Sequence, residues 1–468
     1  MWIDIDKRSN VPMFRQIHLA VRGRILSGEL AAGLRLPSTR ELAAGLGVSR
    51  NIVLEAYELL LAEGFIVARS GSGTYVAEGA FIPPTASASA PRPRAASSLS
   101  CIGPQPGEAA ENGFVSFRTG LPALELFPRK VWGDLLRSAA RDAEQSSFGY
   151  GDSAGDPRLR YILSRYLADT RGVAVRPEQL VITAGAVQAI HLTSSLLLAE
   201  GDRVMAEEPT NPELKSILSS TGAALHSLPV DDSGLVTAAL PGSFPPKLIY
   251  VTPSHQFPVG GILPIQRRIE LIVYAQHTGS LILEDDYDSE FRYDGVPVHS
   301  LQSLAPEQVF YVGTFSKVMF PALRIGYIVL PAAYAADFVR LKRLIDYQTP
   351  GLEQLALAQF IEQKGLHSHI YKMKKVYRRR RGVLLECLNR AFPERIRICG
   401  RAAGLHLTAE FSSPLPKNLS RLMKEEGVYT AVLEGNRVVM GYGHLKEEQI
   451  REGVQRLKRA LNRGTGQH

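Results

Sequence analysis

The chain is poor in cysteine and in long apolar runs. Its three cysteines, Cys101, Cys387 and Cys399, form no Cys-x-x-Cys pair, which argues against a disulfide framework and against a cysteine zinc site. No apolar run approaches the roughly 18–20 residues of a membrane span. The first residues lack a basic segment followed by an apolar one, so we expect no secretory signal. These absences predict a cytoplasmic protein with no membrane association.

The composition is that of a globular protein of more than one domain. The 468 residues are 45% hydrophobic and 21% charged, which excludes a disordered or fibrous chain. The formal net charge of +8 permits an acidic partner such as nucleic acid without showing one.

Three zones follow one another along the chain. Residues 1–77 hold short helical patterns, and residues 78–113 are rich in Ala, Ser and Pro without apolar periodicity, which predicts a linker. In residues 114–468 short β-rich runs alternate with helical stretches, and Gly, Pro or Asp bounds each run. That alternation predicts an α/β fold with a largely parallel sheet.

The N-terminal zone predicts three helices and a hairpin. Apolar residues at helical spacing indicate a first helix over 11–27, and Ser38 with Glu41 forms a capping box for a second. Ser49 is expected to cap a third helix that buries Ile52, Ala56, Leu59 and Leu60, and the segments 65–67 and 74–76 are expected to pair as a hairpin.

This order of elements is that of a winged helix-turn-helix, and its polar positions suit DNA. The start of the third helix would meet base edges and phosphates, arginines would reach the backbone, and a glycine would let the wing approach closely. The DNA-binding residues predicted in this way are Arg35, Ser38, Arg40, Ser49, Arg50, Asn51 and Gly73.

The competing interpretation is a small helical dimerisation domain with solvated arginines. Charge alone favours it, because residues 1–80 hold nine Lys/Arg against eight Asp/Glu. The order of elements outweighs charge. The segment from Leu36-Pro-Ser-Thr-Arg to Gly71-Ser-Gly-Thr74 resembles the winged helix of the GntR family, which implies binding to double-stranded operator DNA.

The third zone contains a lysine with unusual surroundings. Lys317 follows Gly313-Thr314-Phe315-Ser316, and Arg324 lies shortly after it. A lone lysine is usually a surface charge, but burial after a strand lowers an amine pKa and permits a Schiff base with an aldehyde cofactor. The hydroxyls and Arg324 suit a phosphate.

Two further segments agree with a cofactor site. In Leu281-Ile-Leu-Glu-Asp-Asp-Tyr287 the period of two places Asp285 and Tyr287 on one face of a strand, where a carboxylate can pair with a pyridine nitrogen. The turn at Gly185 leads from a strand into a helix, whose backbone N–H groups favour a phosphate.

Together these segments resemble the fold type I aminotransferases over residues 114–468. The resemblance implies pyridoxal 5'-phosphate as cofactor, with Lys317 as the catalytic lysine that carries the internal aldimine, Asp285 on the pyridine nitrogen and Tyr287 on the phenolic oxygen. The residues expected around the phosphate are Gly185, Ala186, Val187, Thr314, Ser316 and Arg324.

The resemblance also implies a homodimer. Tyr150, in Tyr150-Gly-Asp-Ser-Ala-Gly155, matches the tyrosine that reaches the phosphate of the neighbouring subunit. A GntR-like winged helix joined to an aminotransferase-like domain resembles the MocR subfamily of transcriptional regulators. That resemblance implies a regulator that senses an amine, an amino acid or pyridoxal phosphate itself.

Three positions depart from the aminotransferase pattern. Phe257 stands where Asn-Pro-x-Gly usually begins, and Asn211 stands where a tyrosine usually stacks on the ring. Val439 aligns with the arginine that binds a substrate carboxylate, and Arg437 lies two residues away on the same strand face. These losses weaken the case for transamination and leave the cofactor prediction intact.

Three functions stay open on the sequence alone. The favoured one is a regulator in which the Lys317 aldimine senses the effector. The alternatives are an active aminotransferase with an accessory DNA-binding domain and a repressor whose large domain binds no cofactor. The basic run Lys372, Lys374, Lys375 and Arg378–Arg381 is expected to be a solvated helix face rather than a DNA contact. Histidines such as His406 and His444 show no metal spacing, so we expect no metal site.

Overall fold

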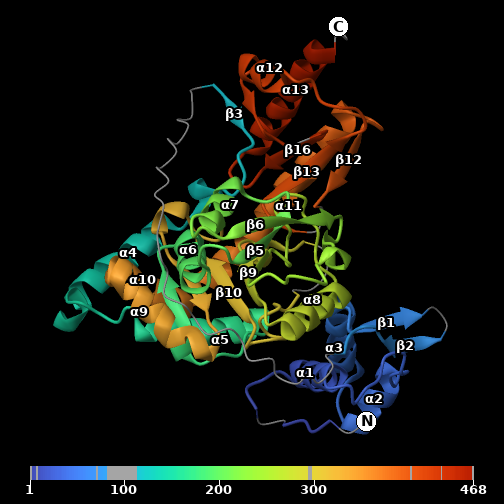
Figure 1. The fold of residues 1–468 in the computed structure, drawn as a ribbon, viewed down its shortest axis with the longest axis vertical. Coiled ribbons are helices and arrows are strands. Elements are labelled where there is room, and N and C mark those ends of the chain that lie inside the picture. The colour runs from blue at the N-terminus through green and yellow to red at the C-terminus, as the bar shows by residue number, and fades with distance from the viewer. Residues whose placement is uncertain are drawn as a thin grey trace.

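The computed structural model describes residues 3–6, 9–69, 72–81, 113–293, 298–400, 403–433 and 435–465. Figure 1 shows the N-terminal elements as a small domain (blue) placed against α8 (Ile265–Thr278) of a larger domain. Most of the predicted linker, residues 82–112, lies outside the described residues. In the described part of the chain no helix has both the length and the apolar character needed to cross a membrane.

The small domain has the predicted order of elements. Its helices and strands are α1 (Met13–Leu26), α2 (Thr39–Leu46), α3 (Arg50–Glu63), β1 (Ile66–Arg69) and β2 (Gly73–Val76). The capping box is present, because Ser38 Oγ accepts from Glu41 N at 3.2 Å and Ser38 N donates to Glu41 Oε2 at 2.8 Å. The antiparallel pairing of β1 with β2 forms the wing.

Two details of α3 differ from the prediction. Ser49 precedes the helix, but its side chain makes no capping hydrogen bond. The buried face consists of Val53, Ala56, Tyr57, Leu60 and Glu63, whereas Ile52 and Leu59 are only half-buried. The face is rotated because Tyr57 packs inward and donates from its hydroxyl to Pro37 O at 2.8 Å.

A mixed eight-stranded sheet forms the centre of the large domain. Its order is β4-β11-β10-β9-β8-β5-β6-β7. β11 and β7 run antiparallel to their neighbours, and the pairs from β10 to β6 are parallel, so the prediction of a largely parallel sheet holds. The strands are β4 (Leu180–Thr183), β5 (Arg203–Glu208), β6 (Ala224–Asp231), β7 (Gly234–Leu235), β8 (Leu248–Val251), β9 (Leu281–Asp286), β10 (Val309–Thr314) and β11 (Gly326–Val329).

Helices cover both faces of this sheet, and alternate strand residues enter different cores. On β9, Leu281 and Leu283 pack with α6, while Ile282 packs with α8. Asp285 therefore follows the α6 side, and Asp286 points to the opposite side. The helices of the large domain are α4 (Arg129–Asp142), α5 (Pro157–Arg171), α6 (Ala186–Leu197), α7 (Pro212–Ser219), α8, α9 (Ala335–Asp346), α10 (Gly351–Glu362), α11 (Gly365–Ala391), α12 (Leu419–Glu425) and α13 (Glu447–Thr465).

A second, smaller sheet lies near the C-terminal end of the chain (Figure 1). Its order is β12-β13-β16-β15, with bounds β12 (Ile396–Cys399), β13 (His406–Phe411), β15 (Ala431–Leu433) and β16 (Arg437–Gly441). The short strands β3 (Val115–Ser116) and β14 (Val428–Tyr429) pair beside it.

The basic run lies on α11, and most of it faces solvent as predicted. Lys372, Lys375, Arg378 and Arg379 are exposed. Arg380 is the exception, because it is buried and its guanidinium binds Gly443 O and Glu125.

Candidate functional site

Lys317 lies in a cavity of about 540 Å³ at the carboxyl ends of the central strands. It follows β10, and its Nζ donates to Gly120 O at 3.0 Å. Burial lowers the pKa of this amine, and the charges of Arg118 and Arg324 act in the same direction against those of Asp288 and Asp285. A lysine held in this way is suited to act as a nucleophile.

Asp285 faces the same cavity from the end of β9. Tyr250 Oη donates to its Oδ2 at 2.7 Å, whereas its Oδ1 is buried and finds no hydrogen-bond partner in the part of the chain that the structure describes. Burial raises the pKa of this carboxyl to about 6, against the hydrogen bond from Tyr250. A buried carboxylate oxygen without a donor fits a protonated pyridine nitrogen, as the sequence predicted for this residue.

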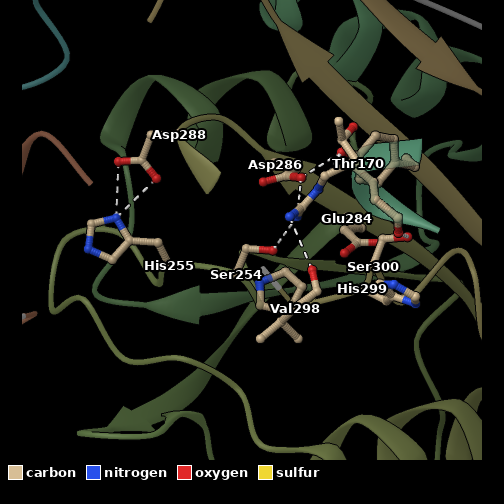
Figure 2. Close-up of polar contacts among 12 residues, drawn as sticks. Thr170, Ser254, His255, Glu284, Asp286, Asp288, Val298, His299 and Ser300 are labelled. Atoms are coloured by element: carbon tan, nitrogen blue, oxygen red, sulfur yellow. Dashed lines mark hydrogen bonds and ion pairs between the residues drawn. The ribbon is translucent and has the colours of Figure 1, made fainter. Parts of the chain in front are cut away.

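Tyr287 belongs to a polar group that also contains His255 and Asp288. Its hydroxyl donates to His255 O at 2.9 Å. Figure 2 shows His255 Nδ1 facing both oxygens of Asp288, at 3.1 and 3.0 Å. His406 packs against the His255 ring, and burial lowers the His406 pKa to about 3, which keeps that imidazole neutral. The sequence had assigned no site to His406.

Asp286 has a different role from Asp285. Its carboxylate forms a buried ion pair with Arg171 and accepts from Tyr311 Oη at 2.5 Å. The same guanidinium donates to Ser254 Oγ at 2.8 Å and to Val298 O at 3.1 Å (Figure 2). These partners lie inside the protein, and of the two neighbouring aspartates only Asp285 lines the cavity.

The residues predicted around a phosphate come together at the start of α6. Gly185 precedes the helix with φ +90°, and a Cβ there would lie 3.0 Å from Arg324 Nη2. Arg324 donates to Ala184 O at 2.7 Å, and the hydroxyls of Thr314 and Ser316 are 3.1 Å apart. Along the cavity wall lie Ala186, Val187, Thr314, Ser316 and Arg324. This combination of a helix N-terminus, hydroxyls and a guanidinium fits a phosphate.

Tyr150 lies outside the cavity of its own chain. Its side chain is 88% exposed, and its ring stands 5.5 Å from that of Tyr347. The described chain alone therefore does not bring it to the predicted phosphate site.

The structure accounts for the departures from the aminotransferase pattern. Asn211 caps α7, with its side chain accepting from Glu213 N at 3.0 Å, so it lines the cavity without stacking over it. Arg437 forms an ion pair with Glu410 at 2.9 Å and does not line the cavity, so it does not replace the arginine missing at Val439.

Arg118 is a cavity residue that the sequence did not reveal. It lies just after β3, exposed, and no other described residue forms an ion pair or hydrogen bond with its side chain. Gly441, at the end of β16, packs against the Arg118 backbone. Its position near Lys317 depends on this long-range contact, so no local pattern could have shown it.

The predicted DNA-binding residues all reach solvent. Arg35 lies beside Gly73 in the wing, and Arg50 Nε donates to Thr39 Oγ1 at 3.4 Å at the start of α2. The wing, α2 and the N-terminus of α3 thus join in one surface. Its exposed members are Arg35, Ser38, Arg40, Ser49, Arg50, Asn51 and Gly73.

Comparisons with known proteins agree with both parts. Residues 14–76 match the family of bacterial regulatory proteins of the gntR family, and residues 127–457 match aminotransferase class I and II. The chain is 36% identical to the probable rhizopine catabolism regulatory protein MocR of Rhizobium meliloti, over 98% of this chain and 95% of that protein.

Two further proteins are similar to this chain. It is 31% identical to the pyridoxine biosynthesis transcriptional regulator PdxR of Corynebacterium glutamicum, over 96% of each chain. The α-aminoadipate aminotransferase LysN of Thermus thermophilus superimposes with a TM-score of 0.70 at 28% identity, over 76% of this chain and 94% of that one. A gntR-type helix-turn-helix followed by an aminotransferase class I and II domain, with this similarity over nearly the whole length, shows that the chain belongs to the MocR-type transcriptional regulators of the GntR family.

Proposed function

We propose that this chain is a pyridoxal-phosphate-dependent regulator that couples the Lys317 cavity to operator binding in the cytoplasm. A DNA-binding domain of residues 1–77 would be joined by a linker of residues 78–113 to a cofactor and dimerisation domain of residues 114–468. The carrying observation is that one chain holds both an exposed helix-turn-helix surface and a cavity lined by Lys317 and by Asp285, whose Oδ1 has no hydrogen-bond partner among the described residues.

In this proposal each cavity residue has one task. Asp285 would hold a proton on the ring nitrogen, Tyr287 would contact the ring oxygen, and Arg324 with the N-terminus of α6 would bind the phosphate. When bound, the cofactor supplies an aldehyde carbon that amines attack. Lys317 is the resident amine at that carbon. An effector amine or amino acid would compete for the same position.

A homodimer completes the proposed site. Large apolar side chains are exposed at Phe148, Tyr150, Leu344 and Tyr347, and Gln348 Nε2 donates to Gly149 O at 3.5 Å between the two segments. A contiguous exposed apolar patch of this kind marks an interface. We propose that a second copy covers it and brings Tyr150 to the phosphate of the other subunit.

The relatives support regulation more than turnover. PdxR is named for pyridoxine biosynthesis and MocR for rhizopine catabolism, so both names concern control of metabolism. The alternative, an active aminotransferase, has support from 29% identity to a 2-aminoadipate transaminase. The capping role of Asn211 and the Glu410 ion pair of Arg437 argue against it.

One set of measurements tests the proposal. Purified protein should show the visible absorbance band of bound pyridoxal phosphate. Candidate amines should change that band and the operator affinity together, because coupling requires an effector to bind two states differently. Steady-state turnover with an amino donor and a 2-oxo acid would favour the enzyme instead. Absence of any cofactor band would refute the proposal.

A further inference from the structure

A buried group of polar side chains lies between the two domains, away from the Lys317 cavity. Glu63 is the last residue of α3 and is 4% exposed, and His18 of α1 is fully buried. His299 belongs to the large domain and lies between β9 and β10. Donor atoms from these three side chains all lie within 4.8 Å of one another.

The contacts in this group lack hydrogen-bond geometry. His18 Nε2 lies 3.2 Å from Glu63 Oε2, and His299 Nδ1 lies 3.3 Å from Glu63 Oε1. None of these four atoms has a hydrogen-bond partner among the described residues. Leaving a buried carboxylate without a hydrogen bond is costly, so the group calls for a further partner.

The arrangement fits a small cation of the zinc type. Metal–nitrogen and metal–oxygen bonds of ~2.0–2.1 Å place neighbouring tetrahedral ligands roughly 3.3 Å apart. The two imidazole–carboxylate separations of 3.2 and 3.3 Å match this spacing, each to a different oxygen of Glu63. We propose that His18, Glu63 and His299 bind one divalent transition-metal ion that ties the winged helix to the large domain.

Arg22 is the charged neighbour that opposes a cation. Its Nε lies 3.7 Å from Glu63 Oε2, and its Nη2 donates to Ser303 Oγ of the large domain at 3.0 Å. The guanidinium is also 5.6 Å from the centroid of the Phe65 ring. The positive charge weakens metal binding, so its removal should strengthen it. If the three side chains instead form an ion-pair cluster without a metal, neither the parent nor a variant that lacks the Arg22 charge should bind a metal ion.

The site would act on the helix that reads DNA. α3 carries Arg50 at its exposed start and Glu63 at its buried end, and a rise of ~1.5 Å per residue separates them by about 20 Å. A metal ion bound by Glu63 and His299 would fix the orientation of α3 relative to the large domain.

The test uses the full-length, cofactor-loaded protein without an affinity tag, stripped of metal by a chelator. Zn²⁺ is titrated against a chromophoric competitor, and Co²⁺ spectra are recorded as differences against the same metal-free protein. One ion should bind per chain. His299→Ala should weaken binding by at least the ~10–100-fold that even indirect ligand contacts contribute. His226→Ala, at an exposed position of β6, is the matched control and should bind like the parent.

Further variants guard against misfolding. His18 is fully buried, so His18→Ala is interpreted only where circular dichroism matches the parent, and His299→Ala leaves the core of the small domain intact. Arg22→Gln should bind Zn²⁺ more tightly than the parent. The proposal is overturned if the parent and His299→Ala bind Zn²⁺ equally well. It is also overturned if Arg22→Gln binds Zn²⁺ more weakly than the parent. Neither outcome bears on the cofactor, whose band is monitored throughout.

Discussion

Replacing Asp285 by asparagine should stabilise the cofactor-free protein while weakening its hold on pyridoxal phosphate. Burial raises the pKa of Asp285 to about 6 from the ordinary 3.8. Because the folded protein holds the proton more tightly than the unfolded chain, its stability falls as the pH rises from 3.8 to about 6 and stays low above that. The difference corresponds to roughly 3 kcal/mol.

Asparagine removes the charge and keeps an oxygen for Tyr250 Oη. Its new amide lies where Oδ1 has no partner, which costs ~1–3 kcal/mol. We therefore expect Asp285→Asn to raise the free energy of unfolding by about 0–2 kcal/mol above pH ~6. The charge contribution should vanish as the pH falls towards 3.8, where the parent carboxyl is protonated too, so the variant should then be the less stable of the two.

The assay is urea-induced unfolding of cofactor-free parent and variant at several pH values, with a separate titration of pyridoxal phosphate. Asp286→Asn is the matched control. It breaks the buried ion pair with Arg171 and should cost ~3–5 kcal/mol. If Asp285→Asn destabilises the protein as Asp286→Asn does, or binds the cofactor as the parent does, the reasoning about the unpartnered oxygen is wrong.

Four other predictions concern the cavity and the DNA surface. Lys317→Ala should lose the cofactor band with the fold intact, and a borohydride-reducible adduct in that variant would identify another amine. Arg50→Ala should cost ~1–3 kcal/mol of operator affinity if the arginine binds a guanine. If the arginine binds a phosphate instead, the slope of log affinity against log salt concentration should fall by about one. Asn51→Ala should relax the preference for one base without changing that slope. If both variants bind operator and random DNA as the parent does, α3 is not the helix that reads DNA. Arg118→Gln should weaken spectral responses to amino acids while sparing amines without a carboxylate, because Arg118 lines the cavity and no described residue pairs with its guanidinium. Arg437→Gln, outside the cavity, is its control, and equal effects of the two variants would remove Arg118 from the site.

The small domain was predictable because its signals are local. The capping box needs only Ser38 and Glu41, and Gly47 and Gly64 end their helices in the left-handed conformation. The strand face on which Asp285 lies was also predictable, since the period of two in β9 decides which carboxylate shares the face of Leu283. In these cases three to seven neighbouring residues determine where a helix begins or ends, or which face of a strand a side chain occupies.

Other features depend on contacts between distant segments. Arg437 shares a strand face with Val439, yet Glu410 on the paired strand binds it, and only the register of β13 with β16 shows this. The unpartnered oxygen of Asp285 depends on Tyr250 from another strand. The group of His18, Glu63 and His299 joins residues from opposite sides of the linker, so no spacing in the sequence could indicate it.

The contact between α3 and α8 restricts how DNA specificity can be exchanged between regulators of this kind. Ile265 and Ile269 of α8 belong to the same apolar core as α1 and α3, and a Cβ at Gly64 would lie 2.5 Å from Ile265. If the winged helix of another regulator were joined to this large domain at the linker, the end of its third helix would pack against α8 of this chain. The mismatch would produce a steric clash or a cavity at that contact. The transferable unit is therefore a winged helix together with the face of α8 that it covers, and chimaeras that carry both should fold where simple fusions aggregate.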